Sequence, residues 1–127
     1  MEAQQHISSL HHDIESWKVD VDFVRKDVRI LKERLVEISG KNTSKEVMVQ
    51  VEHFQNLFLR QHEVADELFH DLKQANRNLR TAVLQVPVFY GPELEDEHAV
   101  LRDRVEIFNK LFHELKNEFN HFLGKWL

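Results

Sequence analysis

Residues 47–86 read VMVQVEHFQNLFLRQHEVADELFHDLKQANRNLRTAVLQV, and this stretch decides the fold. Apolar side chains recur in it at alternating gaps of three and four residues, and the same spacing runs through residues 7–38 and 94–126. We call these positions the seam; all of them are apolar except Gln61 and His98. A sustained 3.5-residue period is typical of helices that pack along a continuous apolar face. The repeat therefore predicts three long amphipathic helices.

The first interruption of the seam is the run SGKN at residues 39–42. Gly40 suits the left-handed conformation that often follows the end of a helix. Thr43 and Glu46 then have the spacing of a capping box, in which each side chain accepts a hydrogen bond from the other residue's backbone N–H. We therefore expect a helix to end near residue 39 and the next to begin near residue 43.

The second interruption is the run PVFYGP at residues 87–92. Pro87 cannot extend a helix, whereas Pro92 suits the first turn of a new one. The aromatic residues Phe89 and Tyr90 lie between the two prolines. They either close the end of the helical assembly or form an exposed contact, and we favour the first role.

These boundaries predict one all-α domain over residues 1–127, with helices at approximately 4–39, 43–86 and 92–126. Both connections are short, so consecutive helices should run antiparallel. The predicted architecture is an elongated, antiparallel (up-down-up) three-helix bundle with coiled-coil-like heptad packing.

Counting helical rise from the two turns also predicts how the helices align. The third helix should stop about 12 Å short of the first turn. Trp126 and Leu127 would cover only part of the seam there, and Lys116 would lie level with Asp20. The seam residues with one neighbouring helix too few would be Leu35, Ile38, Val47 and Val51.

The composition narrows the classes of function. The chain has 127 residues, a net charge of −5 and no cysteine. Nucleic acid is therefore not an expected partner, because binding to it is driven by neutralising phosphates. No apolar stretch approaches the roughly 20 residues of a membrane-spanning helix, and the first residues lack the pattern of a secretory signal. We expect a cytoplasmic protein.

The chain has nine histidines, which are possible metal ligands. The Glu-x-x-His spacing occurs at Glu67–His70, Glu95–His98 and Glu118–His121. This spacing resembles that of the ferritin-like carboxylate bundles, and the resemblance implies a di-iron site in the bundle core. However, the heptad places Glu67 and His70 on the outer face of their helix and His121 behind the seam. We therefore expect no buried di-iron site.

A metal site on the flanks of the helices is the remaining possibility. His62, His113 and Glu118 fall within a few ångströms along the predicted bundle axis, and imidazole and carboxylate groups can hold zinc or iron. The alternative is that all three lie on solvated helix faces. His98 is expected to be a structural or surface histidine. Gln61 is expected to fix register or oligomeric state, with ligand binding as the alternative.

Several apolar residues lie behind the seam, where a closed three-helix bundle does not need them. They are Val19, Phe23 and Ile30 in the first helix and Val100 and Ile107 in the third. One interpretation is scattered surface residues, which are normal in soluble proteins. The other is a second apolar stripe that contacts another protein, most simply a second copy of the chain. We favour the second interpretation.

No nucleophile motif and no glycine-rich phosphate loop is present in the sequence. We therefore expect a non-enzymatic interaction or scaffold protein that self-associates, in the simplest case as a homodimer, and that needs no cofactor. One alternative is a His- and carboxylate-based metal-binding bundle for metal storage or redox chemistry. A second alternative is a binder of lipid surfaces, although the mixed charge of the helices is not the basic face that such binders usually have.

Overall fold

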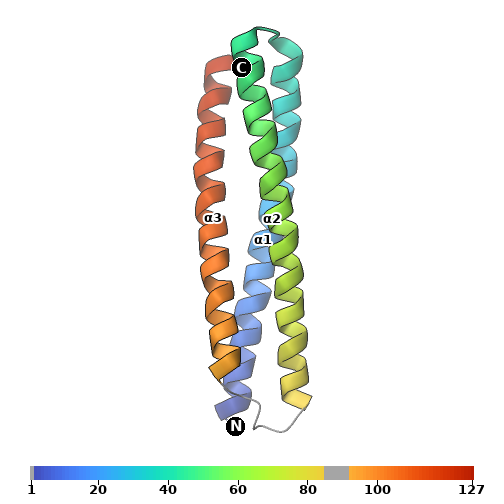
Figure 1. Cartoon of the computed structure of the whole chain (residues 1–127), viewed down its shortest axis with the longest axis vertical. Coiled ribbons are helices and arrows are strands. Elements are labelled where there is room, and N and C mark those ends of the chain that lie inside the picture. The colour runs from blue at the N-terminus through green and yellow to red at the C-terminus, as the bar shows by residue number, and fades with distance from the viewer. Residues whose placement is uncertain (1, 85–91) are drawn as a thin grey trace.

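The computed structural model describes residues 2–84 and 92–127. Three helices account for nearly all of them: α1 (Glu2–Lys41), α2 (Lys45–Leu84) and α3 (Pro92–Trp126). Each helix contacts the other two, and the chain runs up, down and up along one long axis (Figure 1). The predicted three-helix bundle is therefore confirmed. Residues 85–86, Pro87, Phe89 and Tyr90, for which we predicted a helix end and a plug, lie outside the described residues.

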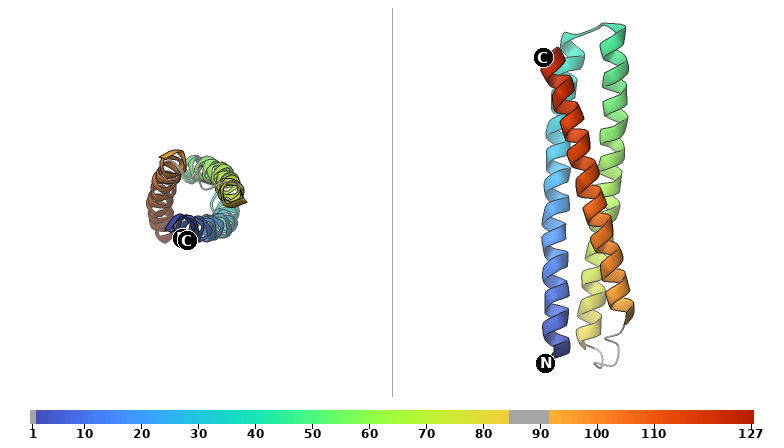
Figure 2. Two further views of the ribbon diagram at one scale, coloured as in Figure 1. Left: turned by 90° about the horizontal axis from the view of Figure 1, so that it is seen from below. Right: turned by 90° about the vertical axis from the view of Figure 1, so that its left-hand side faces the viewer.

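The helices are not strictly parallel rods. α3 is inclined to α1 and α2 along the bundle, and its last turn lies near the end of α1 (Figure 2). The C-terminus consequently lies close to the turn between α1 and α2, whereas the N-terminus lies at the opposite end (Figures 1 and 2).

The predicted left-handed glycine at the end of α1 is wrong. α1 continues through Gly40 to Lys41, and no described residue has a positive φ. The backbone N–H of Asn42 still donates to the carbonyl of Ile38 at 3.0 Å, which is the regular helical bond. α1 therefore extends slightly beyond the expected end because the helical hydrogen bonds persist through the glycine.

The predicted capping box is wrong: a single hydrogen bond from one residue further along caps α2, and Val47 at the third helical position has no side-chain acceptor to return it. The Ser44 hydroxyl accepts a hydrogen bond from the backbone N–H of Val47 at 3.4 Å, and the Ser44 carbonyl accepts from Met48 at 3.0 Å. Ser44 rather than Thr43 is therefore the N-cap of α2. Glu46 remains in the first turn, where its negative charge suits the helix dipole.

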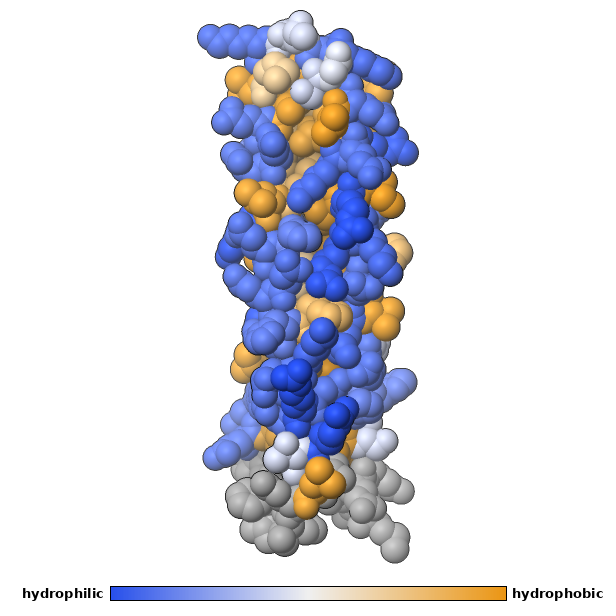
Figure 3. Space-filling view, turned by 90° about the vertical axis from the view of Figure 1, so that its right-hand side faces the viewer, coloured by the Kyte–Doolittle hydropathy of each residue, from blue (hydrophilic) through white to orange (hydrophobic). Residues whose placement is uncertain are grey.

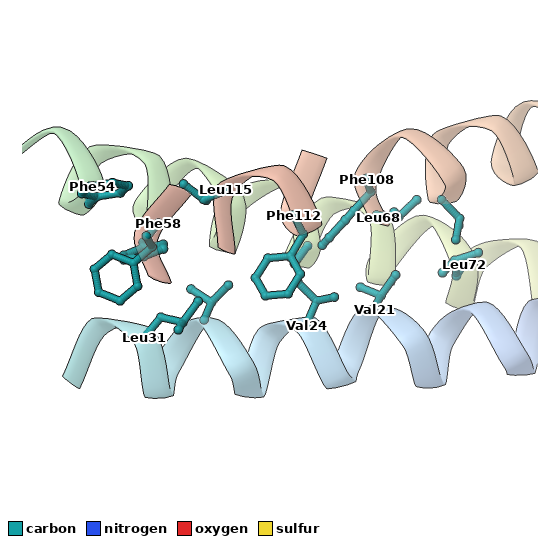
Figure 4. Close-up of a cluster of buried hydrophobic side chains, with 14 of the residues drawn as sticks. Val21, Val24, Leu31, Phe54, Phe58, Leu68, Leu72, Phe108, Phe112 and Leu115 are labelled. Carbon is teal, nitrogen blue, oxygen red and sulfur yellow. The ribbon is translucent and has the colours of Figure 1, made fainter. Parts of the chain in front are cut away.

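The seam residues form the core, as the heptad predicts. A single cluster of buried side chains runs along the bundle and receives residues from all three helices. In its middle, side chains such as Val24, Leu68 and Phe112 point between the helices (Figure 4). Further along, the rings of Phe58 and Phe119 meet edge to face with centroids 4.9 Å apart. The apolar contact is continuous rather than broken into separate patches.

The predicted alignment of α3 is wrong by about one heptad. Lys116 Nζ lies 2.6 Å from Asp27 Oδ2, not beside Asp20. Seven residues correspond to about 10 Å of helix, so α3 lies that much closer to the α1–α2 turn than the count suggested. The count placed α1 and α2 level at their turn, whereas the pairing of Arg25 with Asp66 shows that α2 is displaced along α1 from that level.

This displacement fills the expected gap near the α1–α2 turn. The Asn42 side-chain amide donates to the carbonyl of Trp126 at 3.2 Å, and the Trp126 ring packs against the core. Leu127 is more than half exposed. All four seam residues for which we predicted a missing neighbour are buried: Leu35, Ile38, Val47 and Val51.

Candidate interaction surface

The outward face of α1 carries exposed apolar side chains, which we call the α1 stripe: Val19, Phe23 and Ile30. The side chains are 68%, 65% and 51% exposed, respectively. They lie where the heptad predicts, on the opposite side of the helix from the buried residues Val21 and Val28. An exposed phenylalanine between two β-branched residues is the largest apolar feature of this face.

Val100 and Ile107 form the corresponding α3 stripe, and they are 57% and 58% exposed. Arg104 lies on the same side of α3 and pairs with Asp71 of α2 at 2.9 Å. The α3 stripe therefore borders α2. On α1, by contrast, Asp27 lies one helical turn after Phe23, beside the stripe, and pairs with Lys116 of α3.

The five predicted interface residues are thus all exposed, but they do not form one continuous surface. The α1 stripe borders the groove between α1 and α3, and the α3 stripe borders the groove between α2 and α3. This separation follows from the direction in which the third helix is placed around the other two, which the heptad alone does not specify.

A shallow hollow of about 290 Å³ lies in the groove between α1 and α3. Buried Phe112 lies against Val24 at its base (Figure 4), and exposed Phe23 stands at its rim. The Asp27–Lys116 ion pair also lines it. The remaining lining residues are Asp20, Asn109 and His113.

A second hollow, of about 330 Å³, lies between α1 and α2 near their turn. Its apolar lining includes buried Leu35 and Val51 together with Val36 and Leu59, which are largely exposed. Figure 3 shows this α1–α2 face of the bundle, on which apolar side chains lie in small groups among hydrophilic ones. The sequence-based predictions did not include this groove. Matching the seam-flanking positions of the two helices at equal distance from the turn would have found it.

His98 is the one histidine whose side chain is almost completely buried among the described residues, at 5% exposed. Its Nε2 lies 2.9 Å from Asp13 Oδ2, and its ring lies 4.7 Å from the ring of Trp17. Arg102 approaches the same Asp13 oxygen at 3.8 Å. Since an ionised carboxylate can only accept, the imidazole donates to Asp13. His98 therefore links α3 to α1 inside the bundle.

Gln61, the second polar seam residue, is 9% exposed. Its amide nitrogen is buried and has no hydrogen-bond partner among the described residues. An unsatisfied buried amide is costly. We therefore expect Gln61 to lower the stability of the bundle, and its role in register or oligomeric state stays a prediction.

The three candidate metal ligands lie in different surroundings. His62 lies 3.3 Å from Asp66 on its own helix, His113 lines the α1–α3 hollow, and Glu118 is exposed on α3. Within residues 2–84 and 92–127, no group of three or more His, Asp and Glu side chains is placed to hold a metal ion. The structure therefore does not bring His62, His113 and Glu118 together.

Arg25 of α1 pairs with two carboxylates and also packs on an aromatic ring. It lies 2.9 Å from Asp22 and 3.1 Å from Asp66 of α2, with its guanidinium 4.2 Å from the centroid of the Phe69 ring. The hydrogen bond to Asp22 raises the pKa of Arg25 above its usual range. The same bond, followed by that from Lys26, lowers the pKa of Asp22. Asp22 is therefore held charged by two cations.

Comparison with known proteins identifies no relative: no family model, no curated protein and no solved structure matches this chain. None of the described helices combines the length and apolar character that crossing a membrane would require.

Proposed function

We propose that this chain is a cytoplasmic, non-enzymatic helical-bundle protein with coiled-coil-like packing, which acts by binding protein and first of all by self-association. The single observation that supports this proposal is the α1 stripe, in which Phe23 is 65% exposed on the outward face of a long helix. Burial of an exposed aromatic side chain is a main source of binding free energy at protein interfaces.

The energetics favour a role for this stripe. Complete burial of a phenylalanine, valine or isoleucine side chain is worth roughly 1.5–3 kcal/mol. Single exposed apolar residues are common, but Val19, Phe23 and Ile30 share one face and can be covered by one partner element. The grooves beside the helices are shallow and half open, which suits side chains of a protein partner better than an enclosed small molecule.

The test is the double substitution Phe23→Asp with Ile107→Asp, which places a charge in each stripe. Both residues are exposed, so helicity and melting temperature should change little. The molar mass from light scattering should fall from that of a dimer to that of a single chain. The control is Asn56→Asp with Asn117→Asp, which adds the same charge at exposed polar positions and should leave the dimer intact.

An unmodified chain with the mass of a monomer at every concentration would contradict self-association. An unchanged dimer mass for the double variant would show that neither stripe is the interface.

A further inference from the structure

Resting on the proposed self-association, we propose that the partner surface is the outward face of α1 in a second copy of this chain. The two α1 helices pack antiparallel about a two-fold axis. Val19 of each copy then faces Ile30 of the other, and Phe23 of each copy faces Lys26 of the other. This arrangement specifies the interface, the partner and the register.

The order of side chains on this face supports the antiparallel pairing. The exposed residues that follow one another on the outward face at gaps of three and four are Ser16, Val19, Phe23, Lys26, Ile30 and Glu33. Reversing the central four places an apolar residue opposite an apolar residue and an aromatic ring opposite a cation. Two-fold symmetry makes each of these contacts twice. The face is therefore complementary to its own reverse.

The ends of the contact are compatible with the same register. Ser16 of each copy faces Glu33 of the other, and a hydroxyl can donate a hydrogen bond to a carboxylate. One turn further out, exposed His12 faces exposed Glu37. Neither pairing brings like charges together, so the charged ends of the face are compatible with the antiparallel arrangement.

Lys26 is available for the contact with Phe23. Its side chain is 70% exposed, and its partner is Asp22 of the same helix at 3.1 Å. Asp22 also holds Arg25 at 2.9 Å, so it keeps a cation when the Lys26 ammonium turns toward a ring. A lysine over the face of an aromatic ring is a favourable contact, and its aliphatic stem adds apolar surface.

The α3 stripe lacks this self-complementarity. Its outward residues at the same spacing are Val100, Asp103, Ile107, Lys110 and Glu114. An antiparallel register that pairs these positions in the way proposed for α1 sets Val100 opposite Lys110 of the copy and Ile107 opposite Asp103. A register that pairs Ile107 with itself leaves Val100 opposite Glu114. Each register therefore sets a carboxylate against an apolar side chain. Ile107 is therefore the matched control for Phe23, because the two are similarly exposed.

The proposed α1–α1 contact is small, and its size limits the stability of the dimer. Val19 to Ile30 covers about 17 Å of helix, and the flanking residues are polar. An interface of this size lies at the low end of the range for specific complexes. The dimer should therefore form and dissociate with concentration rather than persist at all dilutions.

Cysteine cross-linking tests the register directly, because the chain contains no cysteine. We expect a mixture of Val19→Cys and Ile30→Cys chains to form a disulfide-linked dimer, whereas each variant alone forms little. A parallel pair would give the reverse, with each variant linking to its own copy. A mixture of Val100→Cys and Ile107→Cys chains is the control and should not link.

A new charge at Ser16 provides a second test that strengthens the dimer. Ser16→Lys places an ammonium opposite Glu33 of the other copy at both ends of the contact. The dissociation constant should fall roughly fivefold at low salt, and high salt should remove the gain. Ser16→Glu is the matched control and should weaken the dimer, because it opposes two carboxylates. In a parallel pair, residue 16 would face its own copy, and Ser16→Lys would weaken the dimer instead.

The outcomes separate this inference from the proposed function. Self-linking of Val19→Cys alone, or dissociation by Ile107→Asp but not by Phe23→Asp, would overturn the α1 pairing while leaving self-association in place. A single-chain mass at every concentration would overturn both.

Discussion

At the scale of single residues, the most specific interaction is the one between His98 and Asp13. The sequence identified His98 as a polar residue in the seam but could not identify its acceptor. Asp13 flanks the seam of another helix, and whether the two meet depends on the relative height of α1 and α3. Trp17 completes the site by covering the imidazole. A seam position therefore predicts burial, whereas the partner of a buried polar group requires the register.

Asp13→Ala should destabilise the bundle by about 1–2 kcal/mol, because it leaves the buried His98 imidazole without its acceptor. The free energy of unfolding in urea measures this change. Asp20→Ala is the control on the same helix, since the Asp20 side chain is exposed and makes no ion pair within the described part of the chain. It should change stability by less than about 0.5 kcal/mol. Equal effects of the two variants would show that the His98–Asp13 contact contributes little.

Gln61→Met should stabilise the bundle by about 1 kcal/mol, because it replaces an unsatisfied buried amide with an apolar side chain of similar length. The melting temperature measures the gain, and light scattering measures the molar mass of the same sample. If Gln61 fixes register or oligomeric state, the more stable variant should show a changed or mixed mass. A less stable Gln61→Met would mean that the amide is satisfied in solution.

At the scale of elements, the sequence predicts the helices well and their relative heights poorly. The seam fixes which face of each helix is buried, and the breaks at residues 39–42 and 87–92 bound the helices to within a few residues. The heptad repeats every seven residues, so sliding α3 by one heptad keeps every seam residue in the core. We predicted Asp20 as the partner of Lys116, whereas the structure has Asp27, and this error corresponds to a shift of α3 by one heptad. Polar contacts, rather than the repeat, distinguish these registers.

The start of α2 gives a prediction for one element. Ser44→Ala should destabilise the protein by about 1 kcal/mol, because the first turn of α2 loses the hydroxyl that caps the Val47 N–H. Thr43→Ala, one residue earlier, should have a much smaller effect. Chemical denaturation of both variants measures the difference. A larger loss for Thr43→Ala would restore the capping box that the sequence suggested.

At the scale of the whole molecule, the core is one continuous cluster that depends on all three helices. Phe58 of α2 is fully buried and meets Phe119 of α3. Phe58→Asp should therefore destabilise the bundle by more than about 4 kcal/mol, since it buries an unpaired charge and removes an aromatic contact. Circular dichroism should show loss of helix across the chain. Phe23→Asp makes the same change on the surface, and retention of helix there is the internal control.

As with the fold, the sequence predicted one part of the candidate surface and not another. The positions behind the seam predicted that Val19, Phe23, Ile30, Val100 and Ile107 are exposed, because the helical period determines which way each residue faces. The helical period could not predict that these residues belong to two separate stripes, because the separation depends on how α3 is placed around α1 and α2. The groove near Val36 and Leu59 was missed for a related reason: it requires matching the levels of two helices.

We propose, above all, that this bundle associates with itself through the α1 stripe. Sedimentation equilibrium of the unmodified chain and Phe23→Asp, each over a range of concentrations, tests it most directly. We expect the mass of the unmodified chain to rise from one chain toward two as concentration increases, and Phe23→Asp to remain a single chain throughout. Identical curves for the two proteins, whether monomeric or dimeric, would contradict the claim.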